Sequence, residues 1–407
     1  MLKLNLRRRY IHAIDHCMGA APLTSTLPRP TDVLPLMESP PGPETVIDGV
    51  RYLYFAGTSY LGLSGNAEVI AAGCEALKNY GVHTATTRAG FGTSPLLLEV
   101  ERRTAEFFGT EAAFYFSSGY TANHIAVQAL AAHADAVFVD DEAHYCVAEA
   151  ARLAGLPVQL FRHRDVEDLR SKLTPGVRPL VMADSVVPSS GRIAPVPDYV
   201  KVLAGFAPAV LHLDDAHGVG ILGENGRGIY DHFGLWPHVN GGPPLDGITL
   251  SMCGTLAKAL GGFGGVIPGT SAWVETVRRA SHYYDGASAP AAPVAGCSAA
   301  ALEICLREPE RRERLRRNVR QLRDGLRAMG IAVGDEPTPN VGVVIRDGAT
   351  MQQLHKMLKA QGILVPYVPA YSGTGPWGLM RFAVCSEHTP EMIARLLAAV
   401  ATILRGL

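Results

Sequence analysis

The chain has 407 residues, 47% of them hydrophobic and 18% charged, which is enough apolar material for a sizeable core and two or three domains. Because 37 Lys and Arg balance 38 Asp and Glu, the charge favours neither a nucleic acid nor an anionic membrane as a partner. The chain shows no apolar run long enough for a membrane span, no secretory leader, and seven scattered cysteines without zinc-site spacing, so we expect a cytoplasmic protein without a bound metal.

The N-terminal part is irregular. Residues 1–45 include the proline-rich section "LPRPTDVLPLMESPPGPE", which cannot be helical throughout. We assign an N-terminal arm to residues 1–58 and expect it to pack on the body of the protein or on a partner subunit.

From residue 59 to residue 295, helical and strand patterns alternate. The segments 66–81 and 96–109 carry apolar residues at the three- and four-residue spacing of amphipathic helices. Short, continuously apolar runs occur at 112–116, 135–140, 158–162, 179–184, 209–215 and 247–252. Such runs are typical of strands buried on both faces. Residues 59–295 are therefore predicted to form a large α/β domain with a mostly parallel sheet flanked by helices.

The pattern changes after residue 295. A long helical region at 309–330 is followed by short apolar runs at 341–347, 362–368 and 379–385, and a final helix is predicted at 389–407. This order predicts a smaller α+β domain over residues 296–407.

Chemically distinctive residues follow the predicted strands, where ligands bind in open α/β sheets. "FSSGYTAN" follows the strand at 112–116 and opens a helix, so the backbone at Ser118, Gly119 and Tyr120 predicts an anion site. A Ser-Gly pair is also ordinary helix-capping chemistry. His144 follows the strand at 135–140, and by itself it is equally a helix-start residue without a role.

Asp214 and His217 stand three residues apart at the end of the predicted strand 209–215, before a glycine-rich run. A carboxylate in this position can keep a cationic ring nitrogen protonated, and an imidazole can bond a phenolic oxygen. The alternative is a surface turn in which both residues are caps. No third clustered ligand accompanies them, so a metal site is not indicated.

Lys258 lies in "GTLAKALGG", among small and apolar residues and without an acidic neighbour. Burial of a lysine lowers its pKa and yields a neutral amine, the nucleophile of Schiff-base chemistry. The alternative is a lysine that reaches water from a turn. Thr255 adds a hydroxyl that can bond an anion. Combined with the preceding motifs, these residues supply a phosphate cradle, a ring-stacking group, a ring-nitrogen partner and an imine-forming amine, as pyridoxal 5′-phosphate (PLP) requires.

The same motifs resemble those of the α-oxoamine synthases, PLP-dependent transferases of fold type I. The resemblance extends from Ser59 to the C-terminus and includes "GTSPLLLEVERRTAEFFG", "SSGYTAN", "DEAH", "DDAHGVGILGENGRG", "GTLAKALGGFGG" and "RFAVCSEHT". It implies that Lys258 forms the Schiff base and later moves protons at the substrate α-carbon. It also implies that Asp214 pairs with the pyridinium nitrogen, His217 bonds the phenolic oxygen and His144 stacks on the ring.

The resemblance assigns binding roles as well. The backbone after Ser118, at Gly119 and Tyr120, would hold the phosphate together with the Thr255 hydroxyl. The arginine that clamps the amino-acid carboxylate corresponds to Arg381, a bidentate task suited to a guanidinium group. The substrate-binding position that is usually Asn in this family is occupied here by Thr58.

The reaction implied is a C-acyl transfer. A small amino acid (glycine, alanine or serine) condenses with an acyl thioester on coenzyme A or an acyl carrier protein, loses carbon dioxide and gives an α-amino ketone. The resemblance also implies a homodimer with the active site at the subunit interface. Two alternatives stay open: another PLP-dependent activity, such as aminotransfer, aldol cleavage or decarboxylation, and a non-catalytic partner subunit. The presence of Lys258 argues against the second.

Two further positions depart from the family pattern. Pro188 replaces the serine that helps to hold the phenolic oxygen, and proline offers neither a hydroxyl nor an N–H group. Ser185 and Ser189 are candidates to compensate. Asp285 lies in the stretch that contacts phosphate from the neighbouring subunit, where Ser288 is the nearest hydroxyl. These changes indicate a divergent member with an altered substrate or reaction.

Overall fold

A computed structural model describes residues 34–407 of the chain, and the part of the predicted arm before residue 34 lies outside the described residues. Strands β1 (Glu44–Ile47) and β2 (Val50–Tyr54) form an antiparallel hairpin, whose turn has positive φ angles at Asp48 and Gly49. β2 also pairs in parallel with β11 (Ile363–Leu364). Residues 44–54 therefore belong to a sheet shared with the C-terminal part of the chain.

The central element is a seven-stranded sheet in the order β3-β9-β8-β7-β6-β4-β5. Its strands are β3 (Ala112–Phe116), β4 (Ala136–Asp140), β5 (Val158–Phe161), β6 (Pro179–Asp184), β7 (Ala209–Asp214), β8 (Ile248–Thr255) and β9 (Gly265–Gly269). Only β9 runs antiparallel to its neighbours, β3 and β8. The predicted α/β fold with a mostly parallel sheet is confirmed, and β9 is the strand that the apolar runs did not indicate.

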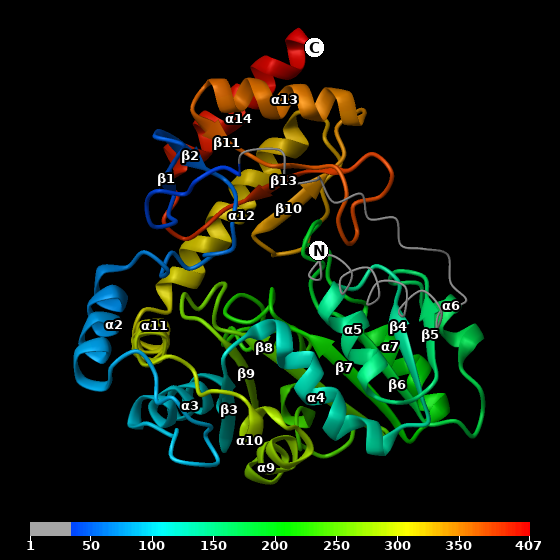
Figure 1. Ribbon diagram of the computed structural model, residues 1–407. Helices are drawn as coiled ribbons and strands as arrows, with labels where there is room; N and C mark the ends of the chain where they lie inside the picture. Colours follow the sequence, from blue (N-terminus) through cyan, green and yellow to red (C-terminus); the bar gives the residue numbers. More distant parts are fainter. Residues whose placement is uncertain (1–33) are drawn as a thin grey trace, which may run out of the picture. The chain divides into compact units, whose positions relative to one another are not determined.

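Helices cover both faces of this sheet (Figure 1). Alternate strand residues face opposite ways: Val137 and Val139 belong to one core layer and Phe138 to the other. The first layer includes α4 (Ala122–Leu130), α5 (Tyr145–Leu153) and α9 (Ser271–Ala280). The second includes α2 (Ala67–Tyr80), α3 (Pro95–Phe108), α6 (Val166–Lys172), α7 (Val196–Leu203), α8 (Ile229–His232) and α11 (Ala292–Arg307). The short helix α10 (Tyr283–Gly286) follows α9.

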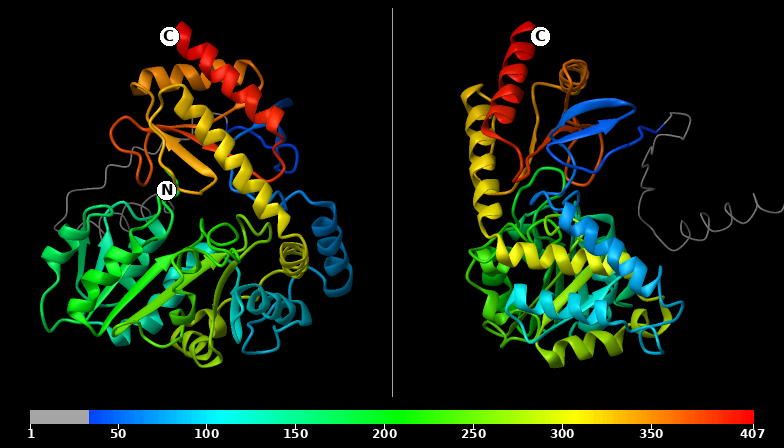
Figure 2. Two further views of the ribbon diagram at one scale, coloured as in Figure 1. Left: turned by 180° about the vertical axis from the view of Figure 1, so that it is seen from behind. Right: turned by 90° about the vertical axis from the view of Figure 1, so that its left-hand side faces the viewer.

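The C-terminal part has an antiparallel sheet in the order β10 (Asn340–Val343), β13 (Leu379–Ala383) and β12 (Tyr367–Val368). Helices α12 (Glu310–Ala328), α13 (Gly348–Ala360) and α14 (Pro390–Gly406) pack on it and on one another (Figure 2). None of the helices within residues 34–407 is both long and apolar enough to cross a membrane.

The predicted domain division stays a prediction, but its second boundary needs adjustment. Residue 295 lies inside α11, which packs on α2 and α3. Because a boundary rarely falls within a packed helix, we propose that the C-terminal domain begins between α11 and α12.

Candidate active site

Residues that follow β3, β4, β6, β7 and β8 meet in one open cleft with about 240 Å³ of free volume. Every predicted site residue except Arg381 lines it: Thr58, Ser118, Gly119, Tyr120, His144, Asp214, His217, Thr255 and Lys258. The lining also includes Cys146, Asp184, Pro188, Ala216, Ala257, Phe263 and Gly264. The parallel strands bring these residues together because their carboxyl ends meet at one edge of the sheet.

Lys258 lies in the turn between β8 and β9, with its amine in the cleft. Burial lowers the pKa of this amine, although the charges of Asp214 and Asp184 oppose the shift. Within residues 34–407 the amine has no hydrogen-bond or ion-pair partner, so it is available as a nucleophile. The turn itself requires Gly261, whose φ is 69° and where a Cβ atom would lie 2.2 Å from that of Leu63.

Asp214 is the last residue of β7, and its carboxylate is held from two sides. Its Oδ2 accepts hydrogen bonds from Asn123 Nδ2 at 2.7 Å and from Cys146 Sγ at 3.4 Å. Its Oδ1 accepts one from the backbone N–H of Ala216 at 2.9 Å. These donors fix the carboxylate in one orientation and leave it able to accept from a protonated ring nitrogen in the cleft.

His144 caps the N-terminus of α5, where its Nδ1 accepts from the backbone N–H of Cys146 at 3.3 Å. Its own backbone N–H donates to Asp184 Oδ2 at 2.7 Å. Burial lowers the pKa of the His144 ring, so the ring is neutral near pH 7 and suited to stacking on a flat ligand. Tyr120 and Tyr371 stand beside it, with ring centroids 5.9 and 6.1 Å away.

Asp184 is half-buried and lies opposite Asp214 at the ends of neighbouring strands β6 and β7. Burial raises the pKa of the Asp184 carboxyl well above its ordinary value, and the nearby Asp214 charge raises it further. The raised pKa of Asp184 favours its protonated form, because two carboxylates close together resist double ionisation.

His217 is connected to Arg381 through Tyr60. His217 Nδ1 lies 3.0 Å from Tyr60 Oη, which accepts from Arg381 Nη2 at 3.2 Å. Since guanidinium can only donate, we assign the Tyr60 proton to the bond with His217 Nδ1, which leaves the proton of the neutral ring on Nε2. Burial, followed by the charges of Lys258 and Arg381, lowers the pKa of His217 far below its usual value.

Arg381 itself lies behind the cleft wall. Its Nε donates to the carbonyl oxygen of Pro188 at 2.9 Å and its Nη1 to that of Gly57 at 3.3 Å. The guanidinium is thus held between β13 and two cleft segments, and its predicted role as a carboxylate clamp stays a prediction.

At the predicted phosphate cradle, the turn at residues 118–120 lies in close contact with Thr255. Thr255 Oγ1 donates to the carbonyl of Gly264 at 2.8 Å and accepts from Ala257 N at 3.1 Å. Ser118 Oγ accepts from the N–H of Tyr120 at 3.2 Å. A Cβ atom at Gly119 would lie 2.5 Å from Thr255 Oγ1, so only glycine allows this approach.

The candidates to compensate for Pro188 have other partners. Ser185 Oγ donates to the buried carboxylate of Asp215, and Ser189 Oγ donates to the carbonyl of Ser372 at 2.7 Å. Neither hydroxyl lines the cleft. The replacement by Pro188 is therefore not offset by either serine in this structure.

Asp285, the other residue that departs from the family pattern, does not line the cleft. Asp285 is exposed on α10, and Ser288 forms an isolated bridge with Thr87. Ser288 lines a second cavity together with Ser117 and Ser118, next to the predicted cradle.

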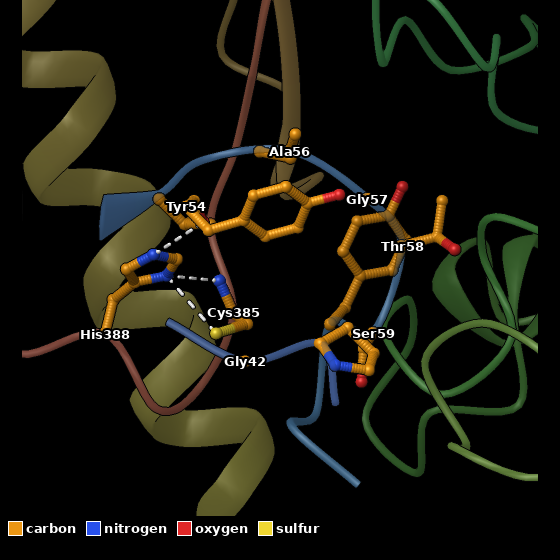
Figure 3. A pocket seen from close by; sticks show the side chains of 12 residues that line it. Gly42, Tyr54, Ala56, Gly57, Thr58, Ser59, Cys385 and His388 are labelled. Carbon is orange, nitrogen blue, oxygen red and sulfur yellow. Dashed lines mark hydrogen bonds between the residues drawn. The ribbon is translucent and has the colours of Figure 1, made fainter. Parts of the chain in front are cut away.

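A small cavity of about 20 Å³ adjoins the cleft and shares Thr58 with it (Figure 3). His388 closes one side: its Nδ1 accepts from the N–H of Cys385 at 2.9 Å, and its Nε2 lies 3.1 Å from the carbonyl oxygen of Tyr54. Its ring stacks on Phe55 with centroids 4.3 Å apart. These contacts anchor the segment after β2, and that segment carries Thr58 and Tyr60.

Sequence reasoning did not identify four residues of the site: Tyr60, Asn123, Cys146 and Asp184. Asp184 carried a usable signal, because it ends an apolar strand run as Asp214 does. Asn123 and Tyr60 stand in the "SSGYTAN" and "SYLGL" motifs, but their partners lie 91 and 157 residues away in the chain. No local pattern indicates such distant pairings.

The chain matches one family model over most of its length. The family model described as aminotransferase class I and II matches residues 53–400. The 8-amino-7-oxononanoate synthase of Nitrosococcus oceani is 35% identical over 376 residues, covering 91% of this chain and 96% of that protein. The enzyme of the same name from Pseudomonas putida is 35% identical over 373 residues, covering 90% and 92%.

The solved structures that match this chain include two serine palmitoyltransferases. A serine palmitoyltransferase from S. paucimobilis, with bound PLP and myriocin, superposes with a TM-score of 0.82 at 30% identity and covers 92% of both chains. The serine palmitoyltransferase of Sphingomonas wittichii gives a TM-score of 0.82 at 26% identity, covering 99% of this chain and 97% of that one.

Proposed function

Because this chain belongs to the aminotransferase class I and II family, with α-oxoamine synthases as its relatives, we propose that it is a PLP-dependent α-oxoamine synthase. It joins a small amino acid to an acyl thioester. The thioester carbonyl carbon bonds to the amino-acid α-carbon, the thiol and carbon dioxide leave, and an α-amino ketone results.

One observation carries the proposal: Lys258, Asp214, His144 and His217 line a single cleft although up to 114 residues separate them. The residues also fit the cofactor. The unpaired amine suits the aldehyde of PLP, and the fixed carboxylate suits its ring nitrogen. The neutral, half-buried ring suits the face of the cofactor ring, and the backbone turn that excludes a side chain suits the phosphate.

PLP, when bound, supplies an electron sink that makes the α-carbon acidic. Burial lowers the pKa of the Lys258 amine and so favours its neutral form, which can take a proton from that carbon and return one. His217 is positioned by Tyr60 to donate through Nε2 toward the cleft. Asp214, held by Asn123, would keep the ring nitrogen of the bound cofactor protonated.

For the substrates, we propose that Arg381 meets the amino-acid carboxylate and that Thr58 lines the same pocket. Arg381 bonds the carbonyl of Pro188, which lines the cleft, and Tyr60, which bonds the cleft residue His217. Glycine, alanine and serine are the proposed amino acids, and coenzyme A or an acyl carrier protein is the proposed carrier.

We also propose a homodimer. An apolar groove beside the cleft is lined by α2, the turn at 261–263 and the start of α11, and Phe263 lines both the groove and the cleft. Ile70 and Leu77, which line this groove, are exposed, and Leu98 and Phe91 are further exposed apolar side chains of the chain, Phe91 at 97%. A second copy that covered this surface would reach the mouth of the active site.

To test this proposal, PLP-loaded protein is mixed with one of the three amino acids and with acyl-CoA donors of increasing chain length. The release of free thiol is then measured. Thiol release that requires both substrates and PLP is expected. Absence of thiol release with every donor, including acyl carrier protein thioesters, would favour another PLP-dependent activity on the same scaffold. Sedimentation of the protein at several concentrations tests the homodimer.

A further inference from the structure

A buried chain of hydrogen bonds lies beneath Asp214, on the face of the sheet that α4 covers. His212 and Asp214 are two residues apart on β7, so their side chains point to the same face. Asn123 on α4 contacts both: its Nδ2 donates to Asp214 Oδ2 at 2.7 Å, and its Oδ1 lies 3.1 Å from His212 Nε2. Asn123 thus connects the two side chains across the layer.

The chain continues onto the next strand. His212 and Ser251 are directly opposite each other in the register of β7 and β8, and His212 Nδ1 lies 3.1 Å from Ser251 Oγ. Cys253 Sγ adds a weaker donor to Asn123 Oδ1 at 3.3 Å. Asn123 and His212 are fully buried and Ser251 is nearly so, at 0%, 0% and 1% exposure.

The direction of every bond follows from Asp214. A carboxylate accepts, so the Asn123 amide must present its NH₂ group to Asp214 and its oxygen to His212. His212 must then carry a proton on Nε2. Burial lowers the pKa of His212 to about 4, so the ring is neutral and its Nδ1 accepts from the Ser251 hydroxyl. All donors therefore point from Ser251 toward Asp214, an arrangement in which successive bonds strengthen one another.

A histidine in the middle of a buried parallel strand is unusual, because such strands are typically aliphatic throughout. A buried polar ring is tolerated only when its nitrogens are bonded, and both nitrogens of His212 are. Val210 on the same face of β7 shows that an aliphatic side chain fits this layer. Packing alone therefore gives no reason for an imidazole at position 212.

We propose that His212 is a positioning residue of the active site: it fixes the orientation of the Asn123 amide and thereby holds Asp214 in place for the cofactor ring nitrogen. This inference rests on the proposed function, since Asp214 meets a ring nitrogen only if PLP is the cofactor. His212 touches neither cofactor nor substrate and acts through Asn123.

Two amide substitutions separate this role from packing. The amide nitrogen of His212→Gln takes the place of Nε2 and still donates to Asn123. His212→Asn has a shorter side chain that reaches Ser251 but not Asn123. We measure the PLP dissociation constant of the apoprotein, the pH dependence of the visible absorption of bound PLP, and the thermal midpoint without PLP.

His212→Asn is expected to bind PLP about two- to tenfold more weakly, the effect of one neutral hydrogen bond, and to shift the pH midpoint of the visible band. His212→Gln is expected to stay close to wild type in both. Thr338→Val is the matched control, because Thr338 is also buried and its hydroxyl is doubly bonded, to the carbonyl of Gly191 and to Arg323 Nη2, but it lies before β10 and does not line the cleft. It is expected to lower the thermal midpoint without changing PLP affinity or the band.

Wild-type PLP affinity and an unchanged band in His212→Asn would overturn the inference and leave the proposed function intact. Equal losses of PLP affinity in His212→Asn and Thr338→Val would also overturn it, because the effect would then follow stability alone. A wild-type protein that binds no PLP would overturn the proposed function itself, and this inference with it.

Discussion

Gly119 offers a direct test of the phosphate cradle, because a single methyl group should disrupt it. A Cβ atom at this position would lie 2.5 Å from Thr255 Oγ1 and 2.6 Å from Thr255 Cβ. Thr255 is itself buried at the end of β8 and bonded to Gly264 O, so its side chain has little room to retreat. The φ angle of Gly119 is not positive, and the effect of Gly119→Ala is therefore steric.

The size of the effect follows from these distances. To reach an ordinary contact of 3.4 Å, Thr255 Oγ1 must move away by about 0.9 Å. Overpacking of this kind costs about 1–3 kcal/mol. Loss of the hydrogen bond to Gly264 adds about 0.5–1.5 kcal/mol. We expect Gly119→Ala to lose about 2–4 kcal/mol, divided between folding and PLP binding.

The assay measures the denaturant midpoint of the apoprotein and its PLP dissociation constant from the visible absorption of the bound cofactor. Gly119→Ala is expected to weaken PLP binding at least tenfold, which corresponds to about 1.4 kcal/mol. Gly205→Ala is the control, because a Cβ atom at Gly205 meets nothing within 4 Å. If Gly119→Ala matched Gly205→Ala in both measurements, the contact between Gly119 and Thr255 would not be the phosphate cradle.

Three further predictions concern individual side chains. Lys258→Ala should abolish the visible band of bound PLP and reduce thiol release by at least about a hundredfold with an unchanged circular dichroism spectrum; retained activity would remove Lys258 from the mechanism. Arg381→Lys, which keeps the charge but not the three bonds of the guanidinium, should raise the KM for the amino acid about tenfold while PLP affinity stays the same; an unchanged KM would argue against the clamp. Burial lowers the pKa of His388 from 6.5 to about 4, so the unfolded chain binds more protons in this interval and the free energy of unfolding falls as the pH drops through it. Denaturant midpoints at pH 7.5 and 5.0 should differ less in His388→Leu than in wild type, and an equal difference would contradict the assignment.

The strand pattern of the sheet was predictable because its signal is local. Buried parallel strands are continuously apolar, and β3, β4, β6 and β7 begin and end within one residue of the predicted runs. The antiparallel β9 was not predicted, since "GVIPG" is short and contains proline and glycine. The hairpin of β1 and β2 was assigned to an arm because nothing near it in the sequence reveals its pairing with β11.

The reactive residues of the site were likewise predictable from local sequence signals, whereas their surroundings were not. Lys258, Asp214, His217 and His144 were identified from the sequence, because each follows a strand and brings a residue type that PLP chemistry needs. The protonation behaviour of these residues could not be identified from the sequence, because the pKa of Lys258 and His217 depends on burial and on charges from distant segments.

The sequence by itself thus determined the family, the order of strands and helices and the reactive groups, because these are properties of residue type and short spacing. Only the tertiary structure decided what holds those groups. In the structure Ser185 bonds Asp215 and Ser189 bonds the carbonyl of Ser372. Arg381 bonds Tyr60 and the carbonyl of Pro188, and Asn123 connects Asp214 with His212. Such contacts join residues far apart in the chain, and they form only when the layers of the fold pack together.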